Sequence, residues 1–307
     1  MNIAAIDIGT NTVLLLVAQC DPVGKITPLL YEQRVPRLGR GIDAEKYLQH
    51  ESMQRVIAVL EEYKVMMSYF DLSSVVVCGT SAVRDARNRE EFAERIKSRL
   101  GFDLEILSGD DEAHWTYRGA ISGVPGTQRA TVVDIGGGST EVTVGDAQRI
   151  TDKISLDIGS VRLTERFFKH DPPANPELEA AIEFVENELA KAKDFHFAGS
   201  TLIGVAGTAT SLAILAQGLC EFKIEAVTNY RLSKDSVYTL FRTLREMPSR
   251  KIKELSTVME GRSDVIAAGA LILREVVAHY KFDVMIVSER GVRYGMAIRE
   301  WERRMGI

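Results

Sequence analysis

A strand, an aspartate and a glycine turn follow one another in both halves of the chain, and this repeat constrains the fold more than any other feature. The first copy is Ile6–Gly9 and the second is Val133–Gly136, so that Asp7 and Asp134 stand 127 positions apart. In each copy an apolar run precedes the turn and another follows it, which is typical of two adjacent strands. We therefore expect two similar domains that face each other across a cleft.

The two glycine turns have the composition of phosphate-binding loops. Successive N–H groups of a glycine-rich turn can surround an anion, and Thr10, Thr12 and Ser139 add hydroxyl donors. An aspartate at the end of the preceding strand suits Mg²⁺, held through water, or a reacting water molecule. For either turn alone a tight hairpin is the alternative, but two copies favour phosphate. The chain contains neither GxxxxGK[ST] nor GxGxxG, which disfavours a P-loop ATPase and a dinucleotide dehydrogenase.

Composition excludes several classes of protein. The 307 residues are enough for about two domains, and the net charge of -5 argues against a general nucleic-acid binder. A locally positive surface can still bind a polyanion. The longest apolar run, Val265–Leu273, is too short to cross a membrane. The three cysteines lie too far apart for a disulfide framework, and no signal segment is recognisable. We expect a cytoplasmic protein.

Three further segments can carry chemistry, and each has a structural alternative. Gly207 and Thr208 end a strand and open a helix whose N–H groups can hold phosphate, although close packing of strand and helix explains them equally well. Arg84 can clamp phosphate with its planar guanidinium or can be a surface arginine. Glu112 closes an acidic run at a helix start, where carboxylates commonly stabilise the helix dipole but can also act as general base on water.

Strands and helices alternate along both halves, which predicts a mixed α/β fold. In the first half we expect strands over 3–8, 13–17, 26–34, 75–78 and 104–107, and helices over 56–70 and from 89 to 100. Ser108 is expected to cap the next helix, and 79–88 is expected to be a loop. After a loop at 123–126 we expect strands over 131–135, 139–144, 202–206 and 284–287, and helices over 176–195, 208–217, 234–247 and 264–280.

Eight segments spread over nearly the whole chain resemble the exopolyphosphatase/guanosine pentaphosphate phosphatase family, within the sugar kinase/Hsp70/actin superfamily. They read AIDIGTNTVLLLV (5–17), RLGRGI (37–42), GTSAVRDARN (79–88), LSGDDEA (107–113), VVDIGGGSTEVTV (132–144), GVAGTATSLA (204–213), GRSDVIAAGALIL (261–273) and SERGVRYG (288–295). The combination of DIGGGSTE with SGDDEA is highly specific. The resemblance implies a short family member without the C-terminal HD-type domain of longer members.

The resemblance also implies an architecture. The family fold consists of two ribonuclease-H-like domains around an interdomain cleft, with a hinge near residues 120–125. We expect domain I to comprise residues 1–122 and a C-terminal helix at about 293–307, and domain II to comprise residues 123–292. The last helix is expected to return to the first domain and to pack on it.

Roles for individual residues follow from the same resemblance. Glu112 falls on the catalytic glutamate that activates water, Arg84 on the phosphate-binding arginine, and Glu141 on a carboxylate that positions the metal ion or water. Asp7, Asp134 and Glu141 would bind Mg²⁺ or another divalent cation. The implied phosphate-binding residues are Gly9, Thr10, Asn11, Thr12, Gly136, Gly137, Gly138, Ser139, Gly207 and Thr208.

The implied activity is that of an exopolyphosphatase, which removes the terminal phosphate of inorganic polyphosphate. Hydrolysis of guanosine pentaphosphate is the alternative, with guanosine tetraphosphate as a related ligand, and the sequence does not separate the two substrates. A small-molecule kinase and a non-catalytic polyphosphate sensor are less consistent with Glu112. The sequence leaves the oligomeric state open, with a homodimer as one option. Basic residues that can line a polyanion path, or simply be surface charges, are Arg37, Arg40, Arg250, Lys251, Lys253, Arg262, Arg290 and Arg293.

Overall fold

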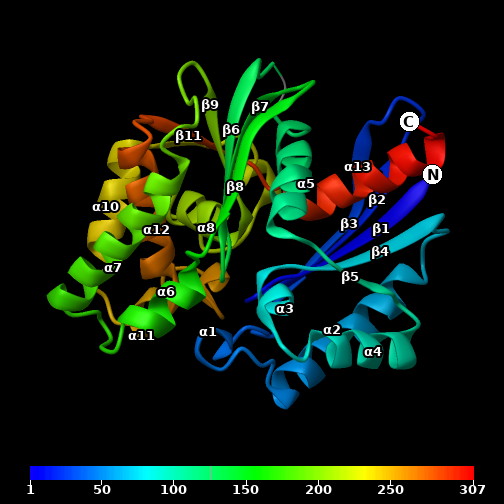
Figure 1. Cartoon of the computed structure of the whole chain (residues 1–307), viewed down its shortest axis with the longest axis horizontal. Coiled ribbons are helices and arrows are strands. Elements are labelled where there is room, and N and C mark those ends of the chain that lie inside the picture. Colours follow the sequence, from blue (N-terminus) through cyan, green and yellow to red (C-terminus); the bar gives the residue numbers. More distant parts are fainter. Residues whose placement is uncertain (125) are drawn as a thin grey trace. The chain divides into compact units, whose positions relative to one another are not determined.

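The chain folds into two compact units, each with its own β-sheet (Figure 1). The computed structural model describes residues 1–124 and 126–307, so Pro125, in the loop expected at 123–126, lies outside the described residues. Unit 1 comprises Met1–Gly119 and Gly291–Ile307, and unit 2 comprises Ala120–Arg290. The expected mixed α/β class is confirmed, while the domain limits expected at residues 122 and 292 stay a prediction.

The sheet of unit 1 has five strands in the order β3-β2-β1-β4-β5. They are β1 (Asn2–Ile8), β2 (Val13–Cys20), β3 (Ile26–Arg34), β4 (Ser74–Gly79) and β5 (Leu104–Ile106). The first three strands form an antiparallel meander, whereas β4 and β5 run parallel to β1. Because parallel neighbours need a crossover connection, the chain places helices before β4 and before β5.

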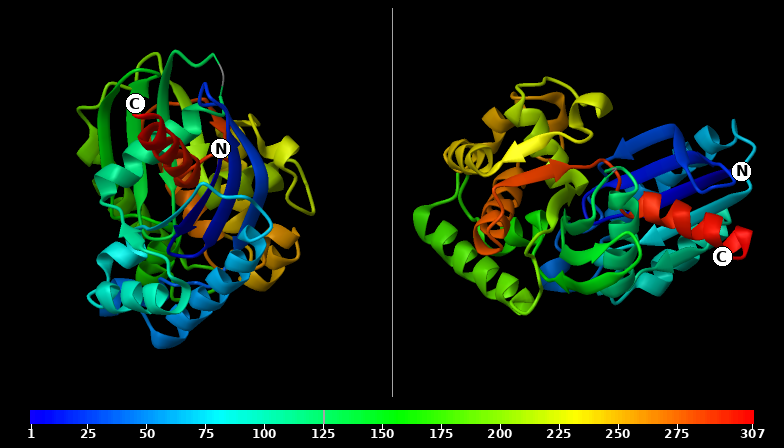
Figure 2. Two further views of the ribbon diagram at one scale, coloured as in Figure 1. Left: turned by 90° about the vertical axis from the view of Figure 1, so that its right-hand side faces the viewer. Right: turned by 90° about the horizontal axis from the view of Figure 1, so that it is seen from above.

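Helices cover both faces of this sheet. Apolar side chains of α2 (His50–Met67) and α4 (Arg89–Leu100) form one core cluster with the central strands. A second cluster joins the strands to α13 (Val292–Met305), which lies alongside them in Figure 2. The remaining helices of this part of the chain are α1 (Ile42–Glu45), α3 (Ser81–Asp85) and α5 (Gly109–Ile121). The C-terminal helix is therefore part of unit 1.

Unit 2 contains a six-stranded sheet in the order β10-β11-β9-β6-β7-β8. The strands are β6 (Arg129–Ile135), β7 (Thr140–Asp146), β8 (Ile150–Leu156), β9 (Thr201–Val205), β10 (Arg231–Ser233) and β11 (Val284–Val287). Strands β6, β7 and β8 form a meander, and β9 runs parallel to β6. The order and directions of β8, β7, β6, β9 and β11 match those of β3, β2, β1, β4 and β5 in unit 1, whereas β10, antiparallel to β11, has no counterpart there.

The helices of unit 2 surround one strongly apolar helix. They are α6 (Ser160–Phe167), α7 (Asn175–Leu189), α8 (Ala206–Ala216), α9 (Ile224–Val227), α10 (Lys234–Leu244), α11 (Ser249–Lys253) and α12 (Ile266–His279), with 3₁₀ turns η1 (Ala190–Ala192) and η2 (Thr257–Met259). Helix α12 is apolar on nearly every side and packs against α6, α7, α8 and α10. A helix with this pattern belongs in a core.

The repeat in the sequence is a repeat in the structure. Strand β6 begins and ends 127 positions after β1, and the turn that follows closes in the same way in both units. The N–H of Gly9 donates to the carbonyl of Thr12 over 2.9 Å, and the N–H of Gly136 donates to that of Ser139 over 3.0 Å. The prediction of two related halves is confirmed at the level of strand register.

Some elements differ from those expected. The segment expected as a loop at 79–88 contains the short helix α3, and β8, α6 and β10 were not expected. The expected helix over 176–195 ends at Leu189 and continues as a 3₁₀ turn. None of the described helices combines the length and the apolar character needed to cross a membrane.

Candidate functional site

Asp7 is a buried carboxylate near the end of β1, just before the first glycine turn. It lies on β1 between β2 and β4, and its Oδ1 atom has no hydrogen-bond partner among the described residues. Burial raises the pKa of Asp7 to about 7, the negative charge of Glu112 adds to this effect, and the Arg293 guanidinium opposes it. A buried carboxylate oxygen without a protein donor is the kind of atom that a hard cation such as Mg²⁺ binds.

The buried Glu112 and the half-buried Arg84 form an ion pair close to Asp7. Arg84 comes from α3, and its Nη1 donates to Glu112 Oε2 over 2.6 Å and to the carbonyl of Leu107 over 3.2 Å. Glu112 lies in the first turn of α5, which Ser108 caps by accepting the N–H of Asp111, as expected. Burial raises the pKa of Glu112, and Arg84 acts against that rise. Arg84 is therefore not a surface arginine.

Unit 2 places two carboxylates side by side at its own glycine turn. Asp134 on β6 and Glu141 on β7 are directly opposed in the antiparallel pair, and both are buried. Opposed residues on neighbouring strands project from the same face of the sheet. Ser155 on β8 donates to Glu141 Oε1 over 2.6 Å, which fixes this carboxylate. The pair has the donor chemistry for a divalent cation.

Gly207 and Thr208 begin α8, beside the end of β6. A Cβ atom at Gly207 would lie 1.7 Å from Nη1 of Arg262, so the guanidinium of Arg262 rests directly on this glycine. Ala206, just before it, has a φ of 63° in the left-handed region that alanine rarely occupies. Backbone strain of this kind is common at ligand sites. Glycine is thus required at position 207 because the guanidinium of Arg262 fills the space of a side chain, rather than because strand and helix pack closely.

Each unit brings its own set of sequence-predicted residues to the carboxyl end of its central strands. Unit 1 holds Asp7, Gly9, Thr10, Asn11, Thr12, Arg84 and Glu112, and unit 2 holds Asp134, Gly136, Gly137, Gly138, Ser139, Glu141, Gly207 and Thr208. Loops at this end of an α/β sheet commonly carry ligands. No group of three or more His, Cys, Asp or Glu among the described residues could hold a metal ion, and Mg²⁺ often uses just one or two carboxylates with substrate phosphates.

Some residues near these sets were missed or misjudged from the sequence. Arg293 was expected along a path or on the surface, but it is buried in unit 1, with its guanidinium carbon 3.8 Å from the ring centre of Tyr31. Ser155 and Arg162 gave no signal, because their strand and helix were not expected. Arg290 is half-buried beside Glu289. The exposed basic residues of the earlier set are Arg40, Arg250, Lys251 and Lys253.

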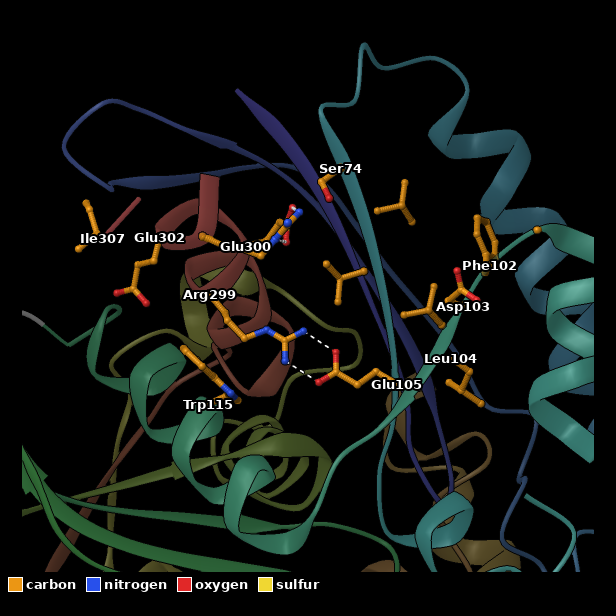
Figure 3. A pocket seen from close by; sticks show the side chains of 15 residues that line it. Ser74, Phe102, Asp103, Leu104, Glu105, Trp115, Arg299, Glu300, Glu302 and Ile307 are labelled. Carbon is orange, nitrogen blue, oxygen red and sulfur yellow. Dashed lines mark hydrogen bonds and ion pairs between the residues drawn. The ribbon is translucent and has the colours of Figure 1, made fainter. Parts of the chain in front are cut away.

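A pocket of about 1190 Å³ lies elsewhere on unit 1, between α13 and the strands β4 and β5 (Figure 3). Its described lining includes none of the predicted site residues. Arg299 faces Glu105 across it with two hydrogen bonds of 2.6 and 2.5 Å, and Arg303 pairs with Glu300 over 2.7 Å. The pocket is therefore separate from the residues that are expected to bind phosphate.

The chain is similar to known proteins over most of its length. The sequence profile described as the Ppx/GppA phosphatase family matches residues 16–304. Exopolyphosphatase 2 of Mycobacterium tuberculosis is 33% identical over 321 residues, which cover 96% of this chain and 97% of that protein. A crystal structure of an exopolyphosphatase from Cytophaga hutchinsonii has a TM-score of 0.90 at 27% identity and covers 100% of this chain and 99% of its own.

Two further relatives are longer than this chain. The guanosine-5′-triphosphate,3′-diphosphate pyrophosphatase of Vibrio atlanticus is 30% identical over 299 residues, 96% of this chain and 58% of that protein. The bifunctional 3-dehydroquinate synthase/phosphatase of Fusobacterium nucleatum is 31% identical over 313 residues, 98% of this chain and 47% of that protein. The chain thus spans about half the length of these relatives.

Proposed function

Because the chain belongs to the Ppx/GppA phosphatase family, we propose that it is an exopolyphosphatase that hydrolyses the terminal phosphoanhydride bond of inorganic polyphosphate. The observation that carries the proposal is the ion pair of the half-buried Arg84 with the buried Glu112, joined over 2.6 Å. Hydrolysis of a phosphoanhydride needs a base for the attacking water and cations against the charge of the phosphoryl group. The pair offers one of each.

Glu112 is assigned the role of general base. Its raised pKa moves it toward the range in which a carboxylate accepts a proton most effectively near neutral pH. It would take one proton from water as the water oxygen attacks the terminal phosphorus. The bridging P–O bond then breaks, so that orthophosphate and a polyphosphate shortened by one unit leave. Arg84 and the N–H groups of the glycine turns would bind the phosphate oxygens.

The carboxylates support the proposal that a divalent cation, Mg²⁺ or a similar ion, takes part. Asp7 has a buried oxygen with no donor in the described chain, and Asp134 and Glu141 are opposed on neighbouring strands. A bound Mg²⁺ would neutralise charge on the phosphate oxygens. Each unit has its own candidate ligands for such an ion, Asp7 in unit 1 and Asp134 with Glu141 in unit 2.

Hydrolysis of the 5′-terminal phosphate of guanosine pentaphosphate is a second candidate function. It uses the same chemistry, and the relative from Vibrio atlanticus favours it. Action in the cytoplasm and assembly as a homodimer, both expected from the sequence, belong to the proposal as well. Cell fractionation and size-exclusion chromatography test them.

The decisive experiment measures phosphate release from long-chain polyphosphate, guanosine pentaphosphate and ATP, each with Mg²⁺ and with EDTA. We expect release from polyphosphate in Mg²⁺ that stops in EDTA and returns when Mg²⁺ is added back. The Glu112→Gln variant, purified in parallel, controls for contaminating phosphatases. Release from guanosine pentaphosphate alone favours the second candidate. ATP consumption that needs an acceptor molecule contradicts both and indicates a kinase.

A further inference from the structure

Two carbonyl groups of the first glycine turn, Gly9–Thr12, accept hydrogen bonds from residues outside the turn. The N–H of Gly39 donates to the carbonyl of Thr10 over 2.8 Å, and the N–H of Arg37 donates to that of Asn11 over 3.1 Å. Gly39 comes so close that a Cβ atom there would lie 2.3 Å from the Thr10 methyl carbon. The segment around residues 37–39 therefore fixes the direction of two peptide groups in the turn.

The second turn is fixed at the matching positions by a different part of the chain. Gly137, the counterpart of Thr10, has a carbonyl that accepts the N–H groups of Val161 and Arg162 over 2.9 and 3.0 Å. Gly138, the counterpart of Asn11, has a carbonyl that accepts the side-chain Nε–H of Arg162 over 2.6 Å. The Arg162 side chain in unit 2 thus does what a backbone N–H does in unit 1.

Arg162 is well placed to hold this peptide group. It is 5% exposed, at the start of α6, and its Nη2 lies 3.8 Å from Asp157 Oδ1. Gly159, the residue before α6, approaches the turn so closely that a Cβ atom would lie 2.4 Å from the carbonyl oxygen of Gly137. The first residues of α6 therefore pack against the carbonyl groups of the second glycine turn.

The direction of these carbonyls decides where the N–H groups point. In a planar trans peptide the C=O and the following N–H point in opposite directions. With the Gly138 carbonyl bonded to Arg162, the N–H of Ser139 is directed away from α6. Three successive glycines adopt either sign of φ with little cost, so without a clamp the peptides of this turn could rotate and present carbonyls instead. An anion site needs the N–H groups on one side.

We propose that Arg162 is a positioning residue, which orients the Gly138–Ser139 peptide so that the second glycine turn presents N–H groups to a phosphate. Arg162 acts through the carbonyl of Gly138 and not on the substrate itself. The inference rests on the proposed role of this turn in binding phosphate. It adds a residue outside the turn, on which the affinity of the turn for phosphate depends.

The test compares Arg162→Met with the wild-type protein. Methionine keeps much of the apolar stem but removes the donor. We expect KM for polyphosphate to rise about tenfold while kcat changes less than threefold, because N–H groups bind phosphate in the ground state as well as in the transition state. Calorimetry with tripolyphosphate in a Glu112→Gln background should show the same tenfold loss of affinity without turnover. Free guanidinium should partly restore the affinity of Arg162→Met.

Arg166→Met is the matched control on the same helix. Its guanidinium carbon lies 4.8 Å from the ring centre of Phe184, so the substitution should alter stability and leave KM unchanged. If Arg162→Met lowers the active fraction but leaves KM and tripolyphosphate affinity unchanged, the inference is overturned. If that variant does not fold, Arg162→Gln is measured in the same way. If the wild type binds tripolyphosphate but releases phosphate from neither tripolyphosphate nor long-chain polyphosphate, the proposed function alone is refuted, whereas no binding overturns the inference as well.

Discussion

Nη1 of Arg84 lies 2.6 Å from Oε2 of Glu112, although the two residues are 28 positions apart. Glu112 is buried and Arg84 is only partly exposed, so the contact is shielded from water. If Arg84 binds phosphate as proposed, the phosphate shares this guanidinium with the carboxylate. Sharing would place the phosphate and the base within reach of one water molecule, as in-line attack requires.

Replacing Glu112 by Gln should lower kcat by about 10²- to 10⁴-fold, the usual contribution of a general base. The amide keeps the size of the side chain but cannot take a proton, so circular dichroism should be unchanged. Glu105→Gln is the control, because that glutamate is half-exposed and bonded to Arg299. A Glu112→Gln variant with near-normal turnover would refute the assignment.

Removing Arg84 should shift the pH profile as well as the rate. Arg84 lowers the pKa of Glu112 against the effect of burial, so Arg84→Met should raise that pKa. The base works in its ionised form, and the acidic limb of kcat/KM should therefore move to higher pH. Arg87→Met, at an exposed arginine just after α3, should leave the limb in place. A limb that moves to lower pH in Arg84→Met contradicts the prediction.

Asp7 should make the metal-free protein less stable as the pH rises. Its pKa is raised from 3.8 to about 7 in the folded state, so the folded protein holds a proton that the unfolded chain has lost between these values. The free energy of unfolding should fall across about pH 4 to 7 by roughly 4 kcal/mol at most. Urea titrations in EDTA, with Asp7→Asn as reference at each pH, isolate this contribution. If the free energy of unfolding of the wild type instead rose with pH relative to that of Asp7→Asn, the prediction would be wrong.

Gly295 should tolerate no side chain. A Cβ atom there would lie 1.9 Å from the carbonyl oxygen of Trp115, so Gly295→Ala must push α13 away from α5. We expect a loss of about 3 kcal/mol in the free energy of unfolding, the upper part of the usual range for overpacking. Gly291→Ala, where nothing lies within 4 Å, is the control. Urea denaturation measures the free energy of unfolding of both variants. Equal values for Gly295→Ala and Gly291→Ala would be inconsistent with this packing.

Features set by neighbouring residues could be predicted from the sequence. The strand, aspartate and glycine turn at Asp7 and at Asp134 were expected, because alternating apolar residues and glycine act locally. Gly101 ends α4 with a φ of 76°, as expected of a glycine in that position. The cap at Ser108 was predicted for the same reason.

Features that depend on contacts between distant residues could not be predicted in this way. Strand β8 (Ile150–Leu156) carries polar residues and is held by its pairing with β7. The five-residue helix α3 is too short to form by its own propensity. The burial of Arg162 arises where α6 meets the glycine turn, and no local pattern marks it. The family resemblance, rather than spacing, assigned Glu112 and Arg84, and their roles stay predictions.

The return of α13 to unit 1 has a consequence for synthesis on the ribosome. Domains generally fold in the order in which they emerge, but the first sheet receives one of its covering helices from residues 292–305. The apolar surface around Ile3 and Leu16 therefore stays exposed while all of unit 2 is being translated. Unit 1 can therefore complete its packing only after unit 2 and α13 have been synthesised. Chaperones have that interval in which to bind its exposed apolar surface.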